Sequence, residues 1–224
     1  MNGSSHTPPA TITTVRTAVL VPGRHLPVDI VLDGFPGPLR PAEGGSWRHD
    51  AGGLTGTAGP TTDLFVDPAG APPVLSAPRL LAAVPDGDFQ LWARVEVEFA
   101  AMYDAGVLLL WAGDDIWAKL CFEFSPQRQP MIVSVVTRGV SDDASGFTVD
   151  GSAAWLRVSL RDGAHAFHAS TDGAFWHLVR HFSLGRAQPD VGFEVQSPVG
   201  QGCTARFTEI AYRTGKLAEL RDGT

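Results

Sequence analysis

The sequence contains little lysine and cysteine and no long apolar run. Its 224 residues include 17 Lys or Arg and 24 Asp or Glu, which gives a formal net charge of −7. The only lysines are Lys119 and Lys216. Nucleic-acid and anionic-membrane surfaces need clustered basic residues, so we expect neither partner. No apolar stretch approaches the roughly 20 residues of a membrane-spanning helix.

The two cysteines, Cys121 and Cys203, belong to no CxxC or Cys/His metal-binding pattern. Both fall in strand-like runs, and we expect free thiols. The N-terminal MNGSSHTPPATITT has neither the basic region nor the apolar region of a secretory signal. We therefore predict a cytoplasmic protein with no cofactor and no metal ion. The sequence leaves the oligomeric state open.

The chain is rich in turn formers, with 25 Gly and 17 Pro, and it carries short runs of strand character instead of helical periodicity. Asp162-Gly163 and Gly113-Asp114-Asp115 predict hairpin turns, and Pro85-Asp86-Gly87-Asp88 predicts a turn between two strands. The strand candidates are Thr13–Val21, Val28–Leu32, Leu54–Thr57, Thr62–Phe65 (a strand, or a turn that docks on the sandwich), Arg79–Val84, Phe89–Phe99, Asp104–Trp111, Ile116–Phe124, Met131–Arg138, Trp155–Arg161, Ala164–Ser170, Trp176–Phe182, Val191–Ser197 and Cys203–Arg213.

These runs predict an all-β fold of about 12 to 14 antiparallel strands in two sheets packed face to face. We expect a flexible N-terminus over residues 1–11 and a single β-sandwich domain over residues 12–213. Within that domain, residues 12–39 are a possible N-terminal addition. Residues 214–224 form a C-terminal tail or a short helix, for which Gly215–Leu220 is the candidate.

The run from Ile116 to Phe124 alternates without a break. Ala118, Leu120, Phe122 and Phe124 fall on one side and predict a core face, while Trp117, Lys119, Cys121 and Glu123 fall on the other. An indole, an ammonium and a carboxylate on one strand side are unusual for a plain solvent face. The second side is therefore the place to look for a function.

Several segments in a fixed order resemble a known family. They are Thr62-Asp63-Leu64-Phe65, Asp86-Gly87-Asp88-Phe89, Tyr103 to Leu108, Trp117-Ala118-Lys119, Ser134 to Arg138, Ser141-Asp142, Trp155 to Val158, Ser170 with Asp172-Gly173, Val191-Gly192-Phe193 and Ser197-Pro198. Together they resemble the regulation-of-enolase-like proteins, a family of unassigned molecular function in the concanavalin A-like lectin/glucanase superfamily. The resemblance covers roughly residues 40 to 212. It implies a concanavalin A-like jelly-roll sandwich of two curved antiparallel sheets with little helix, whose concave face binds carbohydrate in many relatives.

The motifs of the superfamily's enzymes are missing from this chain. Retaining glucanases need two carboxylates about 5 to 5.5 Å apart on one strand. The pairs Glu96 with Glu98 and Asp114 with Asp115 fit a solvated strand face and a turn better. The chain has no G-x-S-x-G elbow, and its seven histidines show no metal spacing. Asp142, Asp143 and Asp150 are more typical of turn aspartates than of calcium ligands.

The polar residues of several strands would form one face if those strands belong to one sheet. A face that combines indoles, guanidinium groups and carboxylates suits a polyol, because aromatic planes stack on sugar rings and planar charged groups bind hydroxyls. The alternative is a purely structural face of cross-strand ion pairs. The predicted ligand-binding residues are Trp117, Lys119, Glu123, Ser134, Arg138, Trp155, Arg157, Glu194 and Gln196, with Tyr103 and Asp104 at the rim.

We predict non-catalytic binding of a small polar, carbohydrate-like ligand on the concave sheet. One alternative is an enzyme of uncommon type (a lyase, isomerase or hydrolase) that uses Glu123 as base and Lys119 or Arg138 to stabilise an anion. The other is a regulatory protein-interaction module, as the family's name implies. A glycan-binding site should have exposed indoles in an open groove, whereas an enzyme should have a deeper pocket with a buried carboxylate or lysine of shifted pKa.

Overall fold

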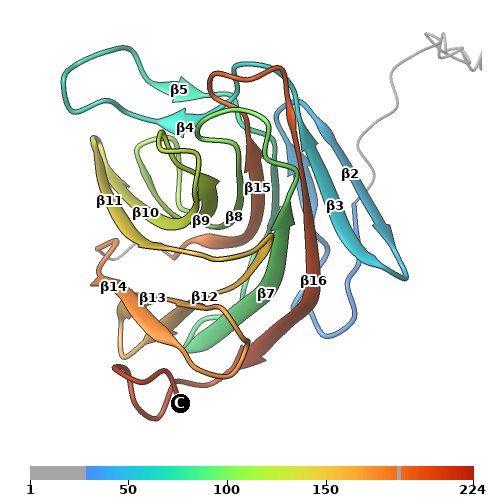
Figure 1. The fold of residues 1–224 in the computed structure, drawn as a ribbon. Coiled ribbons are helices and arrows are strands. Elements are labelled where there is room, and N and C mark those ends of the chain that lie inside the picture. The colour runs from blue at the N-terminus through green and yellow to red at the C-terminus, as the bar shows by residue number, and fades with distance from the viewer. Residues whose placement is uncertain (1–28, 186–187) are drawn as a thin grey trace, which may run out of the picture.

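The computed structural model describes residues 29–185 and 188–224, which form two seven-stranded antiparallel sheets and a small hairpin (Figure 1). In spatial order the first sheet is β1 (Arg40–Ala42), β6 (Arg79–Ala82), β15 (Asp190–Gln196), β8 (Ala105–Trp111), β9 (Ile116–Phe124), β10 (Pro130–Arg138) and β11 (Ser141–Thr148). The second is β14 (His177–Phe182), β13 (Ala164–Ser170), β12 (Ala153–Arg161), β7 (Phe89–Val97), β16 (Cys203–Thr214), β3 (Gly53–Ala58) and β2 (Ser46–Asp50). The hairpin pairs β4 (Leu64–Phe65) with β5 (Val74–Leu75). These residues include no helix, so the predicted all-β jelly-roll sandwich is confirmed.

The main core lies between the two large sheets. Ala118, Leu120 and Phe122 of β9 belong to the same buried cluster as Leu91 of β7 and Leu156 of β12. The interior assignment of alternate residues on β9 is therefore correct. Each fully buried large apolar side chain stabilises the fold by about 1.5 to 3 kcal/mol, so this alternation fixes which side of β9 faces the second sheet.

The first sheet is curved, and the β4–β5 hairpin covers part of its concave side (Figure 1). Leu64 of the hairpin packs with Leu109, Trp117 and Val135, which lie on the concave side of β8, β9 and β10. A second, smaller cluster on the same side contains Ala105, Val107, Cys121 and Val133. Of the two alternatives for Thr62–Phe65, the strand forms, as β4, and it docks on the sandwich through Leu64.

All three predicted turn segments connect the strands that they were expected to join. Asp162-Gly163 joins the paired strands β12 and β13, and Gly113-Asp114-Asp115 joins β8 and β9. At Pro85–Asp88 the chain bends between β6 and β7, and these two strands belong to different sheets. Turn residues change the direction of the chain locally, but they do not determine whether the two strands that they connect pair with each other.

Four strands escaped prediction: the short strands β1 and β5, and the edge strands β2 and β11, which carry little apolar alternation. β11 has the sequence SDDASGFT and is mostly exposed, since it forms one edge of the first sheet. β2, with SWRHD, is the corresponding exposed edge of the second sheet. An edge strand with both sides near solvent lacks the period-two pattern on which strand prediction depends.

The described residues before β1 pack against the sandwich. The run Thr13–Val21 and the segment 1–11 lie outside the described residues. Ile30 bridges Leu39, and both Leu32 and Leu39 are buried in the main core. The described part of the possible N-terminal addition therefore shares that core.

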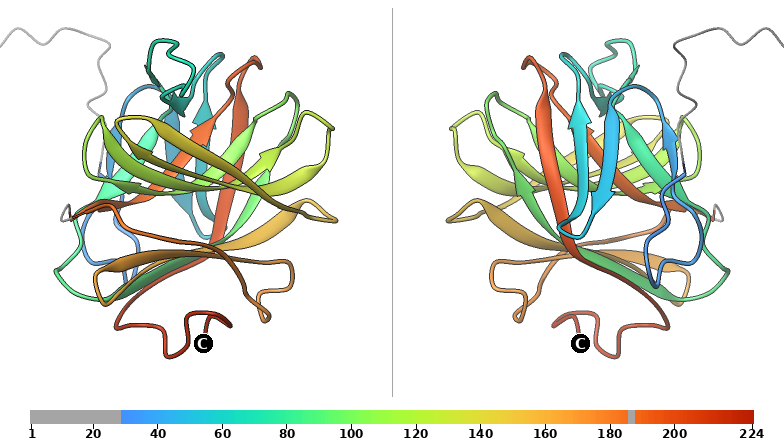
Figure 2. Two further views of the ribbon diagram at one scale, coloured as in Figure 1. Left: turned by 90° about the vertical axis from the view of Figure 1, so that its left-hand side faces the viewer. Right: turned by 90° about the vertical axis from the view of Figure 1, so that its right-hand side faces the viewer.

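The predicted short helix at Gly215–Leu220 does not form. This segment consists of bends and turns and passes along the outer side of β12 and β13 (Figure 2). Arg161 donates to the carbonyl of Leu217 at 3.0 Å, and Arg157 donates to that of Gly223 at 2.6 Å. Arginine side chains of the second sheet thus donate hydrogen bonds to carbonyl groups of the tail, which is not helical.

Both cysteines are free and buried, in agreement with the expectation. Cys121 lies on β9 and Cys203 on β16, in opposite sheets. Within residues 29–185 and 188–224 there is no helix of a length and apolarity that could cross a bilayer.

Candidate functional site

Strand register brings polar side chains of distant segments into adjacent rows on the concave side of the first sheet. One row runs across β11, β10, β9, β8 and β15, and the next two rows begin from Cys121 and Glu123 of β9. The rows are Asp143–Val135–Lys119–Leu109–Gly192, then Cys121–Val107–Glu194–Arg79, then Glu123–Ala105–Gln196. Lys119, Glu123, Glu194 and Gln196 thus lie on one side of one sheet, as the alternation predicted.

Lys119 is the central cation of this face, and it is 2% exposed. Its Nζ donates to Gln196 Oε1 at 2.7 Å and to Asp63 Oδ1 at 3.1 Å. Gln196 in turn donates from Nε2 to the carbonyl of Tyr103 at 3.1 Å. The ammonium therefore joins the sheet to the segment that leads into the β4–β5 hairpin.

A pocket of about 340 Å³ opens beside Lys119. Its walls combine polar, apolar and aromatic side chains from β4 and the residue before it, from β9, β10, β11 and β15, and from the loops that follow β7 and β15. The lining residues are Asp63, Phe65, Tyr103, Lys119, Glu123, Val135, Asp143, Gln196, Pro198 and Val199. This volume is at the lower end of the range for small-molecule sites.

Two glutamates on this face are buried without a hydrogen-bond or ion-pair partner among the described residues. Glu123 lines the pocket and is 9% exposed, and Glu194 is fully buried with neither carboxylate oxygen partnered. Burial raises the pKa of Glu123 to about 8, and Asp143, Asp63 and Glu194 add to this rise while Lys119 opposes it. Burial also raises the pKa of Glu194 to about 7, against the opposing effect of Lys119. Burial therefore favours the protonated form of both groups, more strongly for Glu123 than for Glu194.

Burial and nearby charges act in opposite directions on the pKa values of Lys119 and Asp143. Burial alone would lower the pKa of Lys119, but Asp63, Glu194 and Glu123 raise it above its ordinary value, so the ammonium stays charged. Burial raises the pKa of Asp143, whereas Lys119 and a backbone hydrogen bond lower it. The site therefore combines one fixed cation with several carboxyl groups that can gain or lose protons.

The structure brings together part of the predicted site. Lys119, Glu123, Gln196 and Tyr103 line the pocket. Trp117 and Glu194 lie on the same side of the sheet but are fully buried. The Trp117 indole packs beneath the hairpin beside Trp111, at 6.5 Å between ring centroids, so it is not an exposed stacking surface.

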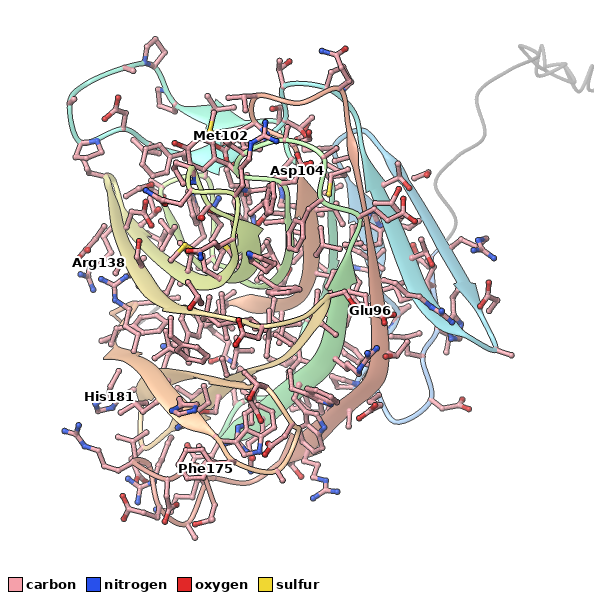
Figure 3. The ribbon with its side chains drawn as sticks, in the orientation of Figure 1. Glu96, Met102, Asp104, Arg138, Phe175 and His181 are labelled. Carbon is pink, nitrogen blue, oxygen red and sulfur yellow. The ribbon has the colours of Figure 1, made fainter. Side chains whose placement is uncertain are left out.

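Ser134 and Arg138 do not share this face. Val135 pairs with Lys119, so the concave residues of β10 are Met131, Val133, Val135 and Thr137. Ser134 pairs with Leu120, a core residue, and is buried on the interior side. Arg138 lies at the exposed end of β10, where Nη1 donates to the carbonyl of Ser183 (Figure 3). The strand is apolar on both sides, so its sequence could not reveal which side is concave.

Trp155 and Arg157 belong to the second sheet. They pair with Arg94 and Trp92 of β7, on the outer side of the sandwich. The Trp155 indole donates to Glu209 Oε2 at 2.9 Å, and the Arg157 guanidinium lies 4.1 Å from the Trp176 ring centroid. The prediction that they share a groove with Lys119 is wrong, because strand alternation does not reveal to which sheet a strand belongs.

Asp104 is fully buried near the β4–β5 end of the sandwich (Figure 3) and is absent from the pocket lining. Its Oδ2 accepts from the backbone N–H groups of Ala100 and Ala101 at 2.9 and 2.8 Å. Its Oδ1 accepts from the Ser197 hydroxyl at 2.7 Å. Asp104 thus fixes the turn that holds Tyr103, whose φ is 69°.

Sequence reasoning missed Asp63, Phe65 and Asp143 as site residues. Asp63 and Phe65 lie in a segment that carried the family resemblance, and Asp143 directly follows another such segment. The family resemblance therefore pointed to these segments, although they lie far apart in the chain. Only the strand order places them around one pocket. Among the described residues no group of three His, Cys, Asp or Glu side chains is arranged to hold a metal ion.

Residues 42–215 match the sequence family described as "Protein of unknown function (DUF1349)". The chain belongs to the DUF1349 family. A stretch of 94 residues, 41% of this chain, is 32% identical to Regulation of enolase protein 1 of Saccharomyces cerevisiae and spans 46% of that relative. The predicted family resemblance is thereby confirmed.

The sandwich of this DUF1349 protein recurs in solved structures. A functionally unknown protein from Saccharomyces cerevisiae superposes with a TM-score of 0.68 and 24% identity, over 76% of this chain and 96% of that one. The GH43 BlXynB protein from Bacillus licheniformis superposes at 0.62 with 15% identity, over 76% of this chain and 35% of that one. The carbohydrate-binding module CBM66 from Bacillus subtilis gives 0.51 with 13% identity, covering 76% and 92%. At these identities the likeness concerns the fold, which the DUF1349 protein shares with carbohydrate-related sandwiches.

Proposed function

We propose that this DUF1349 protein binds a small, polar, carbohydrate-like ligand in the pocket beside Lys119. The observation that carries the proposal is a concave-face pocket with a charged, hydrogen-bonding floor and partly apolar walls. Lys119 and Gln196 supply fixed polar groups, Glu123 supplies an unpartnered carboxyl group, and Tyr103 and Phe65 supply aromatic surface. A sugar presents both hydroxyls and C–H faces, so it matches this combination.

The size of the pocket limits the ligand. About 340 Å³ suits one or two sugar rings better than a long chain. The β4–β5 hairpin packs over the neighbouring part of the concave face, and Trp117 beneath it is fully buried. The proposed ligand therefore occupies one end of the concave face, where Tyr103 is 37% exposed.

Binding is tested by isothermal titration calorimetry and a thermal-shift screen against neutral mono- and disaccharides. Tyr103→Ala and Gln196→Ala should each weaken binding at least about tenfold, the effect of one lost stacking or charge-assisted contact. Arg138→Ala and Trp155→Ala are matched controls outside the pocket and should bind like the wild type. Equal affinities in all five proteins would place the ligand elsewhere.

A second candidate is catalysis by proton transfer in the same pocket. The observation that favours it is Glu123, a buried carboxyl group whose pKa is raised to about 8 and which can therefore donate a proton at neutral pH. Each sugar that binds should be incubated with the protein and followed by NMR. Turnover that Glu123→Gln abolishes, with binding retained, would support an enzyme, and an unchanged spectrum would support binding alone.

A further inference from the structure

Among the described residues that line the pocket, the carboxyl groups of Asp63, Glu123 and Asp143 outnumber the one cation, Lys119. Lys119 is already engaged by Asp63 and Gln196, at 3.1 and 2.7 Å. Glu123 and Asp143 also line the pocket, and neither has an ion-pair partner there among the described residues. Asp142, the neighbour of Asp143 on β11, is the residue that pairs with Arg180. A ligand that enters this pocket therefore meets carboxyl groups without a counter-charge.

Glu123 is the group that most clearly lacks a partner. Its carboxyl group is nine-tenths buried and borders the pocket, yet no described residue donates to it or pairs with it. A buried carboxylate without a partner carries a large desolvation cost, which a proton or a cationic ligand can remove. Glu194, fully buried in the neighbouring row, adds a second carboxyl group with no described partner.

The remaining walls suit an organic cation better than a metal ion. Metal ions need several converging ligands, and no such group of three acidic, His or Cys side chains exists among the described residues. Tyr103 and Phe65 place aromatic rings at the pocket, and aromatic rings attract ammonium groups. Val135, Pro198 and Val199 leave room for an apolar or C–H surface next to that charge.

We propose that the ligand of this pocket carries an ammonium group that pairs with Glu123 and Asp143, as an amino sugar would. This inference rests on the proposed carbohydrate-like ligand and specifies its charge. Anionic ligands such as sugar acids and sugar phosphates are disfavoured, because Lys119 is already engaged by Asp63 and Gln196 and an anion supplies no counter-charge to the acidic side chains of the pocket. Neutral sugars bind with intermediate affinity.

The experiment compares glucosamine, N-acetylglucosamine, glucose and glucuronate on the wild-type protein by calorimetry at pH 7. The acetyl derivative keeps the nitrogen but removes its charge, so it is the matched control for the ammonium group. Glucosamine should bind about tenfold or more tightly than N-acetylglucosamine and glucose, as expected for one charge-assisted contact. Glucuronate should bind most weakly. Glucosamine binding should also release protons from Glu123, which two buffers of different ionisation enthalpy detect.

Variants assign the preference to the pocket. Glu123→Gln combined with Asp143→Asn should reduce the ratio of glucosamine to glucose affinity to near one, while the exposed control Glu98→Gln should keep the wild-type ratio. If glucose and glucosamine bind wild type equally, the ammonium inference is overturned and the proposed function stands. Ethanolamine, which carries an ammonium group but no sugar ring, is measured in parallel. If ethanolamine binds but no sugar does, the ammonium inference stands and the proposed carbohydrate-like ligand is overturned. Absence of binding by every compound overturns both.

Discussion

The ammonium of Lys119 lies 3.1 Å from the carboxylate of Asp63, and this contact joins the middle of the first sheet to the segment before β4. The Lys119 side chain is 3% exposed and that of Asp63 is 21% exposed. Ser141 of β11 reinforces the same hairpin, since its backbone N–H donates to Val66 and its hydroxyl accepts from the Val66 N–H. The hairpin that borders the pocket is thus attached to the first sheet by the ion pair at Asp63 and by the two hydrogen bonds between Val66 and Ser141.

Removal of Lys119 should destabilise the protein more than removal of Asp63. Lys119→Met leaves Glu194, Glu123 and Asp63 without their shared cation, whereas Asp63→Asn leaves Lys119 with Gln196 and the nearby carboxyl groups. We expect the free energy of unfolding to fall by about 3 kcal/mol or more in Lys119→Met and by about 1 kcal/mol in Asp63→Asn. Urea unfolding at pH 7 measures both.

The exposed pair of Lys216 and Asp162 provides the control for these two variants. Lys216→Met should change stability by less than about 0.5 kcal/mol, because exposed ion pairs contribute little. A Lys119→Met protein as stable as the wild type would contradict the electrostatic role given to this lysine.

Glu123→Gln should change how stability depends on pH. Between its ordinary pKa of 4.5 and about 8, folded Glu123 holds a proton that the unfolded chain has lost. The free energy of unfolding therefore decreases as pH rises through this range. Glutamine resembles the protonated acid, so Glu123→Gln should match wild type near pH 4 and exceed it at pH 8.5 by about 1 to 3 kcal/mol. Urea titrations at several pH values test this.

Glu194 contributes a slope of the same sign up to about pH 7, so the Glu123→Gln profile should flatten without becoming level. Glu98→Gln, at an exposed position, should run parallel to wild type across the whole range. Parallel profiles for Glu123→Gln and wild type would show that Glu123 is ionised alike in the folded and unfolded chains.

Deletion of residues 217–224 should destabilise the second sheet. The tail buries Leu217 and supplies the carbonyls of Gly223 and Leu220 to Arg157 and His168. We expect a loss of about 2 to 4 kcal/mol, from one large apolar side chain and two buried polar contacts. Chemical denaturation measures the loss, and Arg221→Ala in the full chain is the exposed control. Unchanged stability would mean that the tail does not stay docked in solution.

The same deletion should reduce the acid sensitivity of the fold. Burial lowers the pKa of His168 to about 4, so its contribution to stability is present above pH 6.5 and is lost as pH falls towards 4. Without the tail His168 becomes exposed, and its pKa should return towards 6.5. Histidine NMR titration of the two proteins compares these values, and equal values would contradict the burial of His168 by the tail.

Asp104→Ala should weaken both stability and the proposed binding. The substitution removes the acceptor of three hydrogen bonds, which the N–H groups of Ala100 and Ala101 and the Ser197 hydroxyl donate. The turn that positions Tyr103 then loses its support. The expected destabilisation is about 2 to 4 kcal/mol, because buried donors are left unsatisfied. A variant with wild-type stability that still loses ligand affinity would instead place Asp104 in direct contact with the ligand.

Local patterns predicted much of the fold and only part of the candidate site. The alternation on β9 correctly divided Leu120 and Phe122 from Lys119 and Glu123. One side of the strand packs into the apolar core between the sheets, while Lys119 on the other side binds Asp63 and Gln196. β10 is apolar on both sides, so its parity was ambiguous and Arg138 was assigned to the wrong face. Edge strand β11, which supplies Asp143, had too few apolar residues to be recognised.

The sequence by itself determined the strand content, the principal core residues and the polar side of β9, since these depend on side-chain period and turn chemistry within a few residues. The tertiary structure decided which strands share a sheet, and so separated Trp155 and Arg157 from Lys119. It also brought Asp63, Tyr103, Asp143 and Gln196 to one pocket. Pairing between distant strands depends on the register and curvature of the whole sheet, which no local pattern contains.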